Sequence, residues 1–516
     1  MLLLVACSQR VHKGFEANRY VNDYALHIVN DPLQLYLKTP QDINNIKDKK
    51  KLSRILKHKE RAYRNVVLYG KTDMDPPYEY FLILDNPTLL SESISENTFV
   101  LDTTIFNHKV SLIGKNLGKD TISYKNDMRY IFRSIRIGAN YRKDISTVND
   151  IVSRYIRSNG FIQAYKDIKN FPAYDKQEAW LKLQMQLTFA SFLDNQNEYD
   201  ELIREFEPEA SQDSISQIIK QNLISEAKVH EKIIAEARQT NLVMVNENHF
   251  MPQHRIFVYN LLSELKANGY KYFALETLNG KQDSLLNLKN GFPTLETGFY
   301  TREQNYGKLI RYAKALGFEF VAYESDNSVE REMGQAKNLY KKTFGIDKNA
   351  KVLLLGGIDH ILEKPTANGK KWLGTVLKEK YNINPLTISQ THLNSYRRFS
   401  KDRIALVDGK LFKNRLQCVD YHLLNNIPRS NSNKQDANFT YKNQHPFPVQ
   451  LTLFLATEIE HENIYQNNIP YHAIYLKPNE KVSLKLPEES IYLYLFDANG
   501  KKVENEVIQV VSKINR

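Results

Sequence analysis

Acidic and imidazole side chains directly follow two short apolar runs in this sequence. Glu247 and His249 come after Leu242–Val245, and Glu276 comes after Tyr272–Leu275. Residues two apart in an extended chain point to the same side, so Glu247 and His249 would face one way. Two histidines with one or two carboxylates can hold a divalent metal with an open position, at which water is activated for hydrolysis. The candidate metal ligands are Glu247, His249, Glu276 and His360.

The same side chains also suit chemistry that needs no metal. A carboxylate or His249 would act as the general base that activates water. Arg331 would stabilise developing negative charge or bind a carboxylate of the substrate. Arg331 and Glu332 open a predicted helix, where such a pair can equally be a simple ion pair, so both interpretations stay open. The candidate catalytic residues are Glu247, His249, Glu276, Arg331, Glu332 and His360.

The elements that would position these residues alternate between strand and helix. Five apolar runs indicate strands, at 242–245, 272–275, 318–323, 352–355 and 386–388. Patterns between them predict helices after Pro252 and over 307–316, 329–344 and 372–380. This alternation predicts a mainly parallel sheet, and ligands bind outside the carboxyl ends of such strands. The polar residues expected at that edge are Glu247, His249, Glu276, Glu324, His360 and His392.

Three short motifs occur in order within residues 241–395, which make up less than a third of the chain. They are Asn246-Glu247-Asn248-His249, Arg331-Glu332-Met333-Gly334-Gln335-Ala336 and Gly357-Ile358-Asp359-His360. Their order resembles the Tiki/TraB, erythromycin-esterase and ChaN-like superfamily, and most of all the ChaN-like haem-binding lipoproteins. The first motif has Asn246 in place of the family's glycine. The second has Glu332 for Asp and Gln335 for Met, and the third fits without change.

The resemblance implies hydrolysis of an ester or amide in some relatives and haem binding in others. A hydrolase of this kind would act on a small-molecule or peptide ligand. A haem-binding protein without turnover would use a His or Tyr as the axial ligand. Its haem plane would be lined by an aromatic insertion with Phe299 and the candidate cofactor-binding residues Tyr300 and Tyr306. A surface-interaction protein with a degenerate site is the third alternative.

The composition and length indicate several domains. The chain has 516 residues, of which 42% are hydrophobic and 25% charged, a globular composition too long for one core. We expect a multidomain α/β protein with a central, mainly parallel α/β sheet domain. A mixed α+β region with strand-like runs at 65–69, 80–84, 98–101, 109–113 and 121–124 would precede it, followed by a helical region. The expected boundaries are 1–17, 18–145, 146–240, 241–424, 425–438 and 439–516.

The last three of these segments differ in pattern. Within the central domain, residues 396–424 are expected to be a connecting segment with a hairpin turn at Asp408-Gly409. Residues 425–438 have the composition of a polar linker. Alternating apolar positions after residue 439 predict a small β-sandwich with an accessory role.

Charge, hydropathy and cysteine content limit the expected partners. Lys and Arg outnumber Asp and Glu by 71 to 59, and the excess is spread out except over 47–64. That run is typical of a solvated helix face, so no nucleic-acid partner is expected. His254 lies among polar neighbours on a predicted helix and is expected to be solvated. No apolar run reaches the ~18 residues of a membrane-spanning helix. Cys7 and Cys418 are the only cysteines and predict no disulfide framework.

Cys7 has another expected use. Leu4-Val5-Ala6-Cys7 is similar to a bacterial lipobox, although the apolar stretch before it is shorter than a full signal. A chance match is the alternative, but we favour a lipidated Cys7 behind a signal remnant and tether over 1–17. Acyl chains would anchor the protein to a membrane without a spanning helix. The expected location is the bacterial cell envelope, on an outer membrane, facing the periplasm or the cell surface.

Overall fold

The computed structural model shows two compact units. One comprises Met1–Ser153 with Phe171–Leu181, and the other comprises Arg154–Asn170 with Lys182–Arg516. The residues that the structure describes are 15–18, 25–30, 34–40, 43–46, 66–72, 77–85, 97–105, 107–117, 121–138, 147–171, 176–326, 329–429, 437–458, 467–487 and 490–510.

The first unit contains two antiparallel sheets. The larger has the strand order β4-β5-β6-β8-β7, with bounds Ile43–Ile46, Val66–Thr72, Tyr78–Leu84, His108–Asn116 and Thr98–Ile105. The smaller has the order β1-β2-β3-β9, with bounds Phe15–Asn18, Ala25–Asn30, Leu35–Pro40 and Arg136–Ile137. Four of the strand-like runs expected between 65 and 113 therefore lie in β5 to β8.

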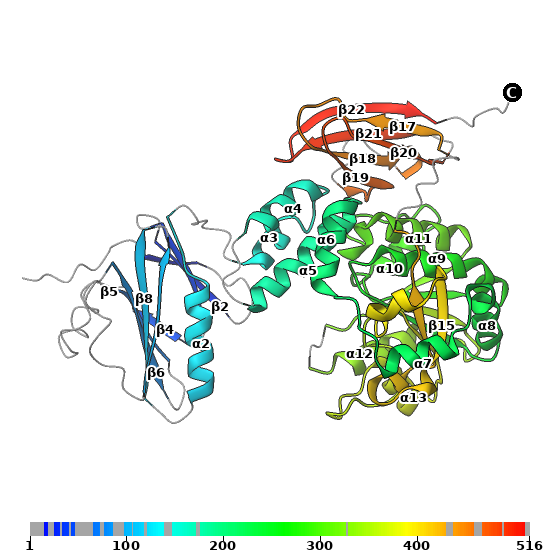
Figure 1. Ribbon diagram of the computed structural model, residues 1–516, viewed down its shortest axis with the longest axis horizontal. Helices are drawn as coiled ribbons and strands as arrows, with labels where there is room; N and C mark the ends of the chain where they lie inside the picture. Colours follow the sequence, from blue (N-terminus) through cyan, green and yellow to red (C-terminus); the bar gives the residue numbers. More distant parts are fainter. Residues whose placement is uncertain are drawn as a thin grey trace, which may run out of the picture. The chain divides into compact units, whose positions relative to one another are not determined.

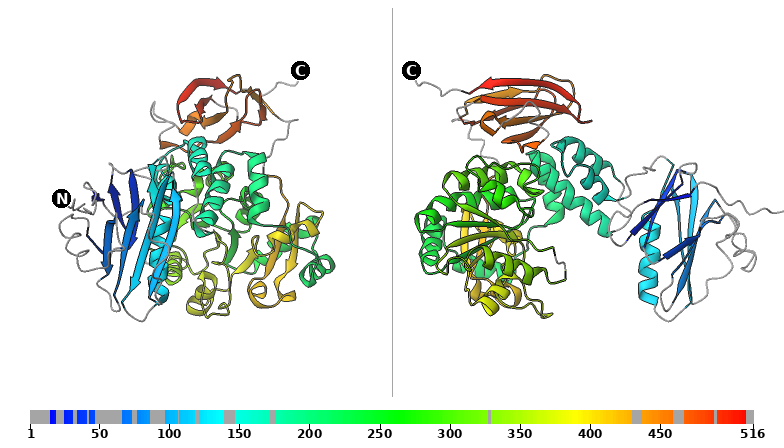
Figure 2. Two further views of the ribbon diagram at one scale, coloured as in Figure 1. Left: turned by 60° about the vertical axis from the view of Figure 1, so that its left-hand side comes forward. Right: turned by 180° about the vertical axis from the view of Figure 1, so that it is seen from behind.

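The run 121–124, which we expected to be a strand, is instead the first turn of helix α2 (Thr121–Arg133). Tyr124, Met128 and Ile131 recur at helical spacing and are all buried in the core of this unit. A Cβ on Gly114 of β8 would lie 2.6 Å from Met128 Sδ, so the bare glycine lets α2 pack closely on the sheet. Figure 2 shows α2 alongside these strands. The helical period over thirteen residues outweighs the β-branched start of the segment.

Helices dominate the stretch between the first unit's sheets and the central sheet, as the sequence predicts. Among the described residues they are α3 to α8, with bounds Val148–Arg154, Phe161–Asn170, Lys176–Phe192, Gln196–Phe206, Ser214–Asn222 and Glu226–Arg238.

The second unit contains a seven-stranded, mostly parallel sheet of order β12-β11-β13-β10-β14-β16-β15. The prediction of a mainly parallel α/β sheet is therefore confirmed. Five parallel strands lie close to the predicted runs, with bounds Leu242–Glu247 (β10), Tyr272–Leu275 (β11), Glu319–Ala322 (β12), Val352–Gly357 (β13) and Leu386–Ser389 (β14).

The last two strands of this sheet come from the segment that we expected to be a connection. β16 (Tyr421–Asn425) pairs parallel with β14, and β15 (Ile404–Asp408) pairs antiparallel with β16. The expected hairpin turn at Asp408-Gly409 is wrong. Asp408 caps a short 3-10 helix, Gly409–Leu411, and the chain runs on to Tyr421 before it pairs.

Helices pack on both faces of the central sheet (Figure 1). Val243 and Val245 of β10 join a core with α8, α9 (Pro252–Ala267) and α11 (Gln304–Ala315). Leu242 and Met244 join a second core with α12 (Arg331–Lys342) and α13 (Leu373–Tyr381). Because helices cover both faces of the sheet, the sequences of these strands are continuously apolar and do not alternate between apolar and polar residues.

The C-terminal strands form two antiparallel sheets around a small apolar core. One pairs β17 (Phe439–Lys442) with β20 (Lys481–Leu484). The other has the order β19-β18-β21-β22, with bounds His472–Leu476, Val449–Leu455, Ser490–Asp497 and Lys502–Gln509. Within the part of the chain that the structure describes, no helix has the length and hydropathy needed to cross a bilayer.

Candidate functional site

The strand order brings polar residues from distant parts of the sequence to one edge of the sheet. β13 lies between β10 and β11, and Glu247 at the end of β10 pairs in register with Gly357 at the end of β13. Glu276 directly follows β11, whose last residue pairs with Leu355 of β13. Parallel strands end at the same edge, so the three carboxyl ends meet there.

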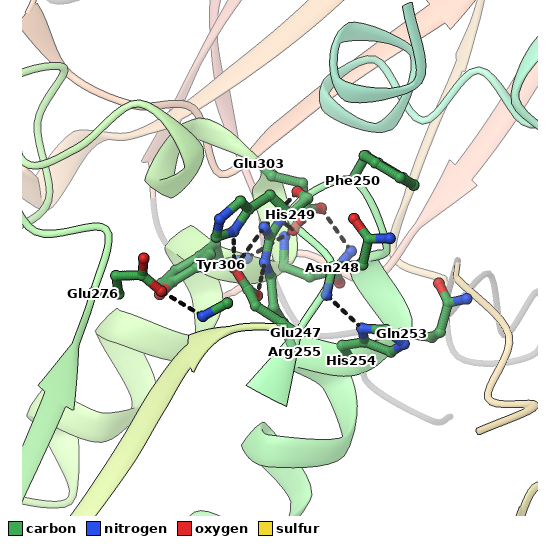
Figure 3. Close-up of polar contacts among 12 residues, drawn as sticks. Glu247, Asn248, His249, Phe250, Gln253, His254, Arg255, Glu276, Glu303 and Tyr306 are labelled. Carbon is green, nitrogen blue, oxygen red and sulfur yellow. Dashed lines mark hydrogen bonds and ion pairs between the residues drawn. The ribbon is translucent and has the colours of Figure 1, made fainter. Parts of the chain in front are cut away.

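Glu247 is buried and orients the ring of His249. Its Oε1 accepts a hydrogen bond from Nδ1–H of His249 at 2.8 Å, and its Oε2 accepts one from Nε–H of Arg255 at 2.8 Å (Figure 3). Burial raises the pKa of this carboxyl, but the charge of Arg255 and the hydrogen bonds from His249 and Arg255 outweigh it and bring the pKa of Glu247 to about 2. Glu247 is therefore an anion, and His249 keeps Nε2 as its free nitrogen.

Arg255 holds this pair in place from the first turns of α9. Its guanidinium also donates to the backbone oxygen of His249 at 2.6 Å and to Oε2 of Glu303 at 3.0 Å. Arg255 and Glu303 are both fully buried, at 0% exposure, and the guanidinium lies over the ring of Tyr306 with 4.5 Å to its centroid. Glu303 is the N-cap of α11 and accepts the N–H groups of Asn305 and Tyr306. The position of His249 thus depends on both α9 and α11.

The second carboxylate, Glu276, lies against the end of β13. The backbone N–H of Gly357 donates to its Oε2. A Cβ on Gly357 would lie 3.1 Å from Glu276 Oε2 and 3.3 Å from His249 Nε2. The carboxylate and the free imidazole nitrogen therefore lie on the same side of Gly357, with no side chain between them from that residue.

Arg331, at the start of α12, connects Glu276 to Glu324, which follows β12 closely. Its Nη2–H groups donate to Glu276 Oε1 at 2.6 Å and to Glu324 Oε2, and its Nε–H donates to Glu324 Oε1 at 3.0 Å. The Arg331 side chain is 37% exposed, so part of the guanidinium faces the pocket. Arg331 thereby supplies positive charge beside the carboxylate.

His360 lies behind Glu276, at 5% exposure. Its Nδ1 is 2.8 Å from Glu332 Oε2, and its Nε2 is 3.1 Å from Glu276 Oε1 and 3.0 Å from Arg331 Nη1. Burial lowers the pKa of this imidazole, but the hydrogen bonds to Glu276 and Glu332 outweigh it and raise the pKa of His360 to about 9. The protonated ring donates one N–H to each carboxylate. Burial alone would raise the pKa of Glu276, and the hydrogen bond from His360 helps to hold it far below its ordinary value.

A pocket of about 630 Å³ opens beside these groups. Its ionisable lining residues are His249, Glu276, Tyr300, Glu324, Asp326, Arg331 and Lys342. Tyr300 stacks on His249 and forms one wall with Phe299. Tyr306, the other candidate aromatic residue, is buried beneath the guanidinium of Arg255 and does not line this pocket.

The six candidate catalytic residues thus form two bonded groups that meet at Gly357. One is Glu247 with His249, and the other joins Glu276, Arg331, His360 and Glu332. His392 lies elsewhere, with Nε2 bonded to Asp359 at 3.0 Å. Cys7 lies outside the described residues.

The expectation that His254 is solvated is wrong. His254 is fully buried, and its Nδ1 accepts the backbone N–H of Asn248 at 3.0 Å. Burial lowers the pKa of His254 to about 3, so the ring is neutral. The first turns of α9 are buried as a whole because they pack under the site, which local polarity does not reveal.

Two site residues, Arg255 and Glu303, were not among the candidates. A signal for Arg255 exists, because it lies three and seven residues before Val258 and Leu262 on the buried stripe of α9. A charged residue on such a stripe requires a buried partner. Glu303 offers a weaker signal, because it is the N-cap of α11, which begins at Gln304, three residues before the start of the predicted helix.

No family model matches the chain, and no curated protein matches it. Two solved structures titled "Bacterial protein toxins" and "Crystal structure of bacterial protein toxins" are similar at 13% and 16% identity, with TM-scores of 0.25 and 0.24. The matches cover 44% and 42% of this chain, and 53% and 46% of those chains. A third, the type III effector HopBA1, is similar at 12% identity and a TM-score of 0.24, over 37% of this chain and 91% of the effector. The chain thus spans about half the length of the toxins it matches, and TM-scores of this size do not establish a shared fold.

Proposed function

We propose that this protein hydrolyses an ester or amide bond in a small-molecule or peptide substrate. The observation that carries the proposal is the free Nε2 of His249. A buried carboxylate orients it, and it lies next to a second carboxylate, Glu276, at an open pocket. An imidazole held in one tautomer by an anion is the usual arrangement of a general base.

In the proposed reaction, His249 Nε2 accepts a proton from a water molecule that Glu276 orients. The water oxygen forms a bond to the carbonyl carbon, and Arg331 stabilises the negative charge that develops on the carbonyl oxygen. Glu247 stabilises the imidazolium that results. The proton then passes from His249 to the leaving alcohol or amine as its bond to the carbonyl carbon breaks. The products are a carboxylic acid and an alcohol or amine.

The residues fit a bound metal ion less well. Two of the four candidate ligands, Glu276 and His360, contact the guanidinium of Arg331, and both oxygens of Glu247 are bonded to Arg255 and His249. The proposed reaction therefore uses no metal ion.

A haem fits less well for a different reason. Tyr306, one of the two tyrosines expected to line the haem plane, is buried away from the pocket, and Nε2 of His249 is directed at Glu276. Binding of a small ligand without turnover, or a degenerate site on a surface-interaction protein, remains the outcome to expect if no hydrolysis is found.

The proposal is tested with the full chain against a panel of chromogenic esters and anilides, with and without EDTA. We expect turnover that EDTA does not remove. His249→Asn and Glu276→Gln should each lower kcat/KM by about 100-fold or more, the size of a general-base contribution.

Two matched controls separate catalysis from general damage. His230→Asn removes another histidine that pairs with a carboxylate, Glu264, outside the pocket, and Glu319→Gln removes a surface carboxylate that pairs with Lys271. Both should retain full activity. Turnover that survives His249→Asn would contradict the proposed role of His249.

We also propose the finer organisation that the sequence suggests. The C-terminal strands would form a small β-sandwich that serves the central domain, and the α+β and helical regions would precede that domain. Lipid on Cys7 would hold the protein in the bacterial cell envelope, and the support is the Leu4–Cys7 tetrapeptide alone. Expression of the full-length gene with Cys7→Ser, followed by membrane fractionation, tests this anchor. Unchanged membrane association would contradict it.

A further inference from the structure

We propose that residues 467–472, which lead into the C-terminal strands, are a positioning element for the candidate site. The proposal rests on the proposed function for its catalytic consequence, but the structural coupling can be measured without it. This element holds the pocket-lining segment 294–304, which carries one wall of the pocket and the carboxylate that binds Arg255.

The pocket-lining segment is held at its first residues by the C-terminal part of the chain. Thr294 and Asn468 form an isolated antiparallel bridge, and the N–H of Leu295 donates to the oxygen of Asn467 at 2.8 Å. Asn468 is in turn fixed by Asn159, whose side-chain amide donates to its backbone oxygen at 2.8 Å. The start of the segment therefore depends on a backbone that lies far away in sequence.

The same short stretch also holds the end of the segment. His472 Nδ1–H donates to Oε1 of Gln304 at 2.7 Å, and His472 Nε2 lies 3.1 Å from Nζ of Lys308. Burial, together with the nearby cations, lowers the pKa of His472 far below its ordinary value, so the ring is neutral. A neutral ring with its proton on Nδ1 can accept from Lys308 and donate to Gln304 at once.

Helix α11 adds a second attachment one turn further along. Arg311 forms a bidentate ion pair with Glu458, at 2.6 and 2.7 Å, and donates to the backbone oxygen of Ile469 at 3.0 Å. Gly307 permits this approach, because a Cβ there would lie 3.2 Å from Ile469 Cδ1 and 2.8 Å from Arg311 Nη1. Bidentate pairs with little solvent exposure fix orientation as well as distance.

Between the attachments at Thr294 and Gln304 lie two groups that act on the position of His249. Tyr300 stacks on His249, and Glu303 binds the guanidinium that holds Glu247. Residues 467–472 therefore control the position of His249 from two sides, through the ring of Tyr300 and through the Glu303–Arg255–Glu247 chain. His472 and Arg311 are positioning residues, since neither contacts the pocket.

The experiment uses the full chain and two variants, His472→Phe and Arg311→Met. Hydrogen–deuterium exchange followed by mass spectrometry should show faster exchange within residues 294–306 in both variants. The expected increase is about tenfold, the effect of losing one buried hydrogen bond on local opening. His472→Gln, which can still donate to and accept from the same partners, should restore slow exchange. With an active substrate, kcat should fall while KM stays within about twofold, because the base rather than the bound ligand is displaced.

Thr440→Ala is the matched control, because it removes a hydrogen bond to Ser483 among the same C-terminal strands but away from α11. It should leave exchange in 294–306 unchanged. Unchanged exchange in both His472→Phe and Arg311→Met would overturn the inference. If the wild-type chain hydrolyses nothing, the proposed function fails. The exchange measurement still decides whether residues 467–472 position the segment 294–304.

Discussion

The ring of Tyr300 lies face to face with the imidazole of His249, with centroids 4.1 Å apart and planes inclined by 17°. This contact covers one face of the base and leaves its edge, with Nε2, directed at Glu276 and Gly357. Burial raises the pKa of Tyr300 to about 12, so its hydroxyl stays protonated near neutral pH. The ring thus acts on His249 by contact and not by charge.

Shortening Tyr300 should therefore matter more than removing its hydroxyl. Tyr300→Phe should retain kcat/KM within about twofold, whereas Tyr300→Ala should lower it by about tenfold, the value of one aromatic stack. Tyr312→Ala breaks another stacked pair, with Tyr259, outside the pocket and should leave kcat/KM unchanged. Equal losses in the Phe and Ala variants would mean that the hydroxyl, rather than the stack, is what the site uses.

Acid should destabilise the protein through Glu247. Its pKa of about 2 lies below the ordinary 4.5, so the folded state favours the carboxylate. The resulting stability, about 3 kcal/mol from a shift of this size, is present above pH 4.5 and is lost as the pH falls toward 2. Urea unfolding of the wild type and of Glu247→Gln between pH 7 and pH 3 measures this.

The Glu247→Gln variant should be less stable at pH 7 by about 3–5 kcal/mol, because buried Arg255 loses a charged partner. Its free energy of unfolding should also fall less steeply with acid than that of the wild type. Glu319→Gln, at an exposed pair with Lys271, should change stability by less than about 0.5 kcal/mol. If the free energy of unfolding fell equally with pH in the wild type and in Glu247→Gln, Glu247 would not be the source of the acid sensitivity.

Alkali should destabilise the protein through His360. Its pKa of about 9 lies above the ordinary 6.5, so the folded state favours the imidazolium. The stability gained is fully present below pH 6.5 and is lost as the pH rises through 9. Glu332→Gln removes one of the two carboxylates that hold the proton and should reduce this loss between pH 6.5 and 9.5. Urea midpoints at these pH values provide the measurement, and His230→Asn should lose stability with alkali as the wild type does.

Gly357→Ala tests the close approach of Glu276 and His249, the two groups that we propose activate water. The added methyl would press on Glu276 Oε2 and His249 Nε2, so kcat should fall by about tenfold or more, the effect of displacing positioned groups. The melting temperature should change little, because the strand conformation tolerates alanine. Gly160→Ala, whose methyl would meet the Ser158 hydroxyl at 3.1 Å away from the site, is the control. Full activity in Gly357→Ala would show that the space beside Gly357 is not used.

The central sheet could be predicted because its strands are short, apolar and followed by polar residues. Glu276, for example, follows Tyr272–Leu275 directly, and both lie where the pattern places them. Strand β16 could not be recognised in the same way. It carries His422 and Asn425 at buried positions, where they bond to the backbone oxygens of Leu416 and Gln253. A segment whose polar groups are satisfied only in the folded protein has the sequence pattern of a loop.

The site residues also differ in how readily the sequence indicates them. Glu247, His249 and His360 stand out because each follows a strand, whereas Arg255 and Glu303 act from helices. Their roles depend on one contact between α9 and α11, the 3.0 Å bond from Arg255 to Glu303. The spacing of Arg255 on the buried stripe of α9 indicates that it needs a buried partner, but no sequence pattern indicates which residue of another helix that partner is. His254 shows the opposite error, in which polar neighbours suggest solvent although tertiary packing buries the ring.

The strand order has a consequence for how the chain is made. β10 ends at Glu247, but its sheet neighbours are β13 and β14, so Leu242 finds its partner only at Val352. During synthesis, the ribosome must extend the chain by more than a hundred residues before β10 has a strand to pair with. Such non-local pairing folds slowly and exposes unpaired edges in the meantime. A nascent chain arrested before residue 352 should therefore be a chaperone substrate, whereas release after residue 425 should allow the whole sheet to close.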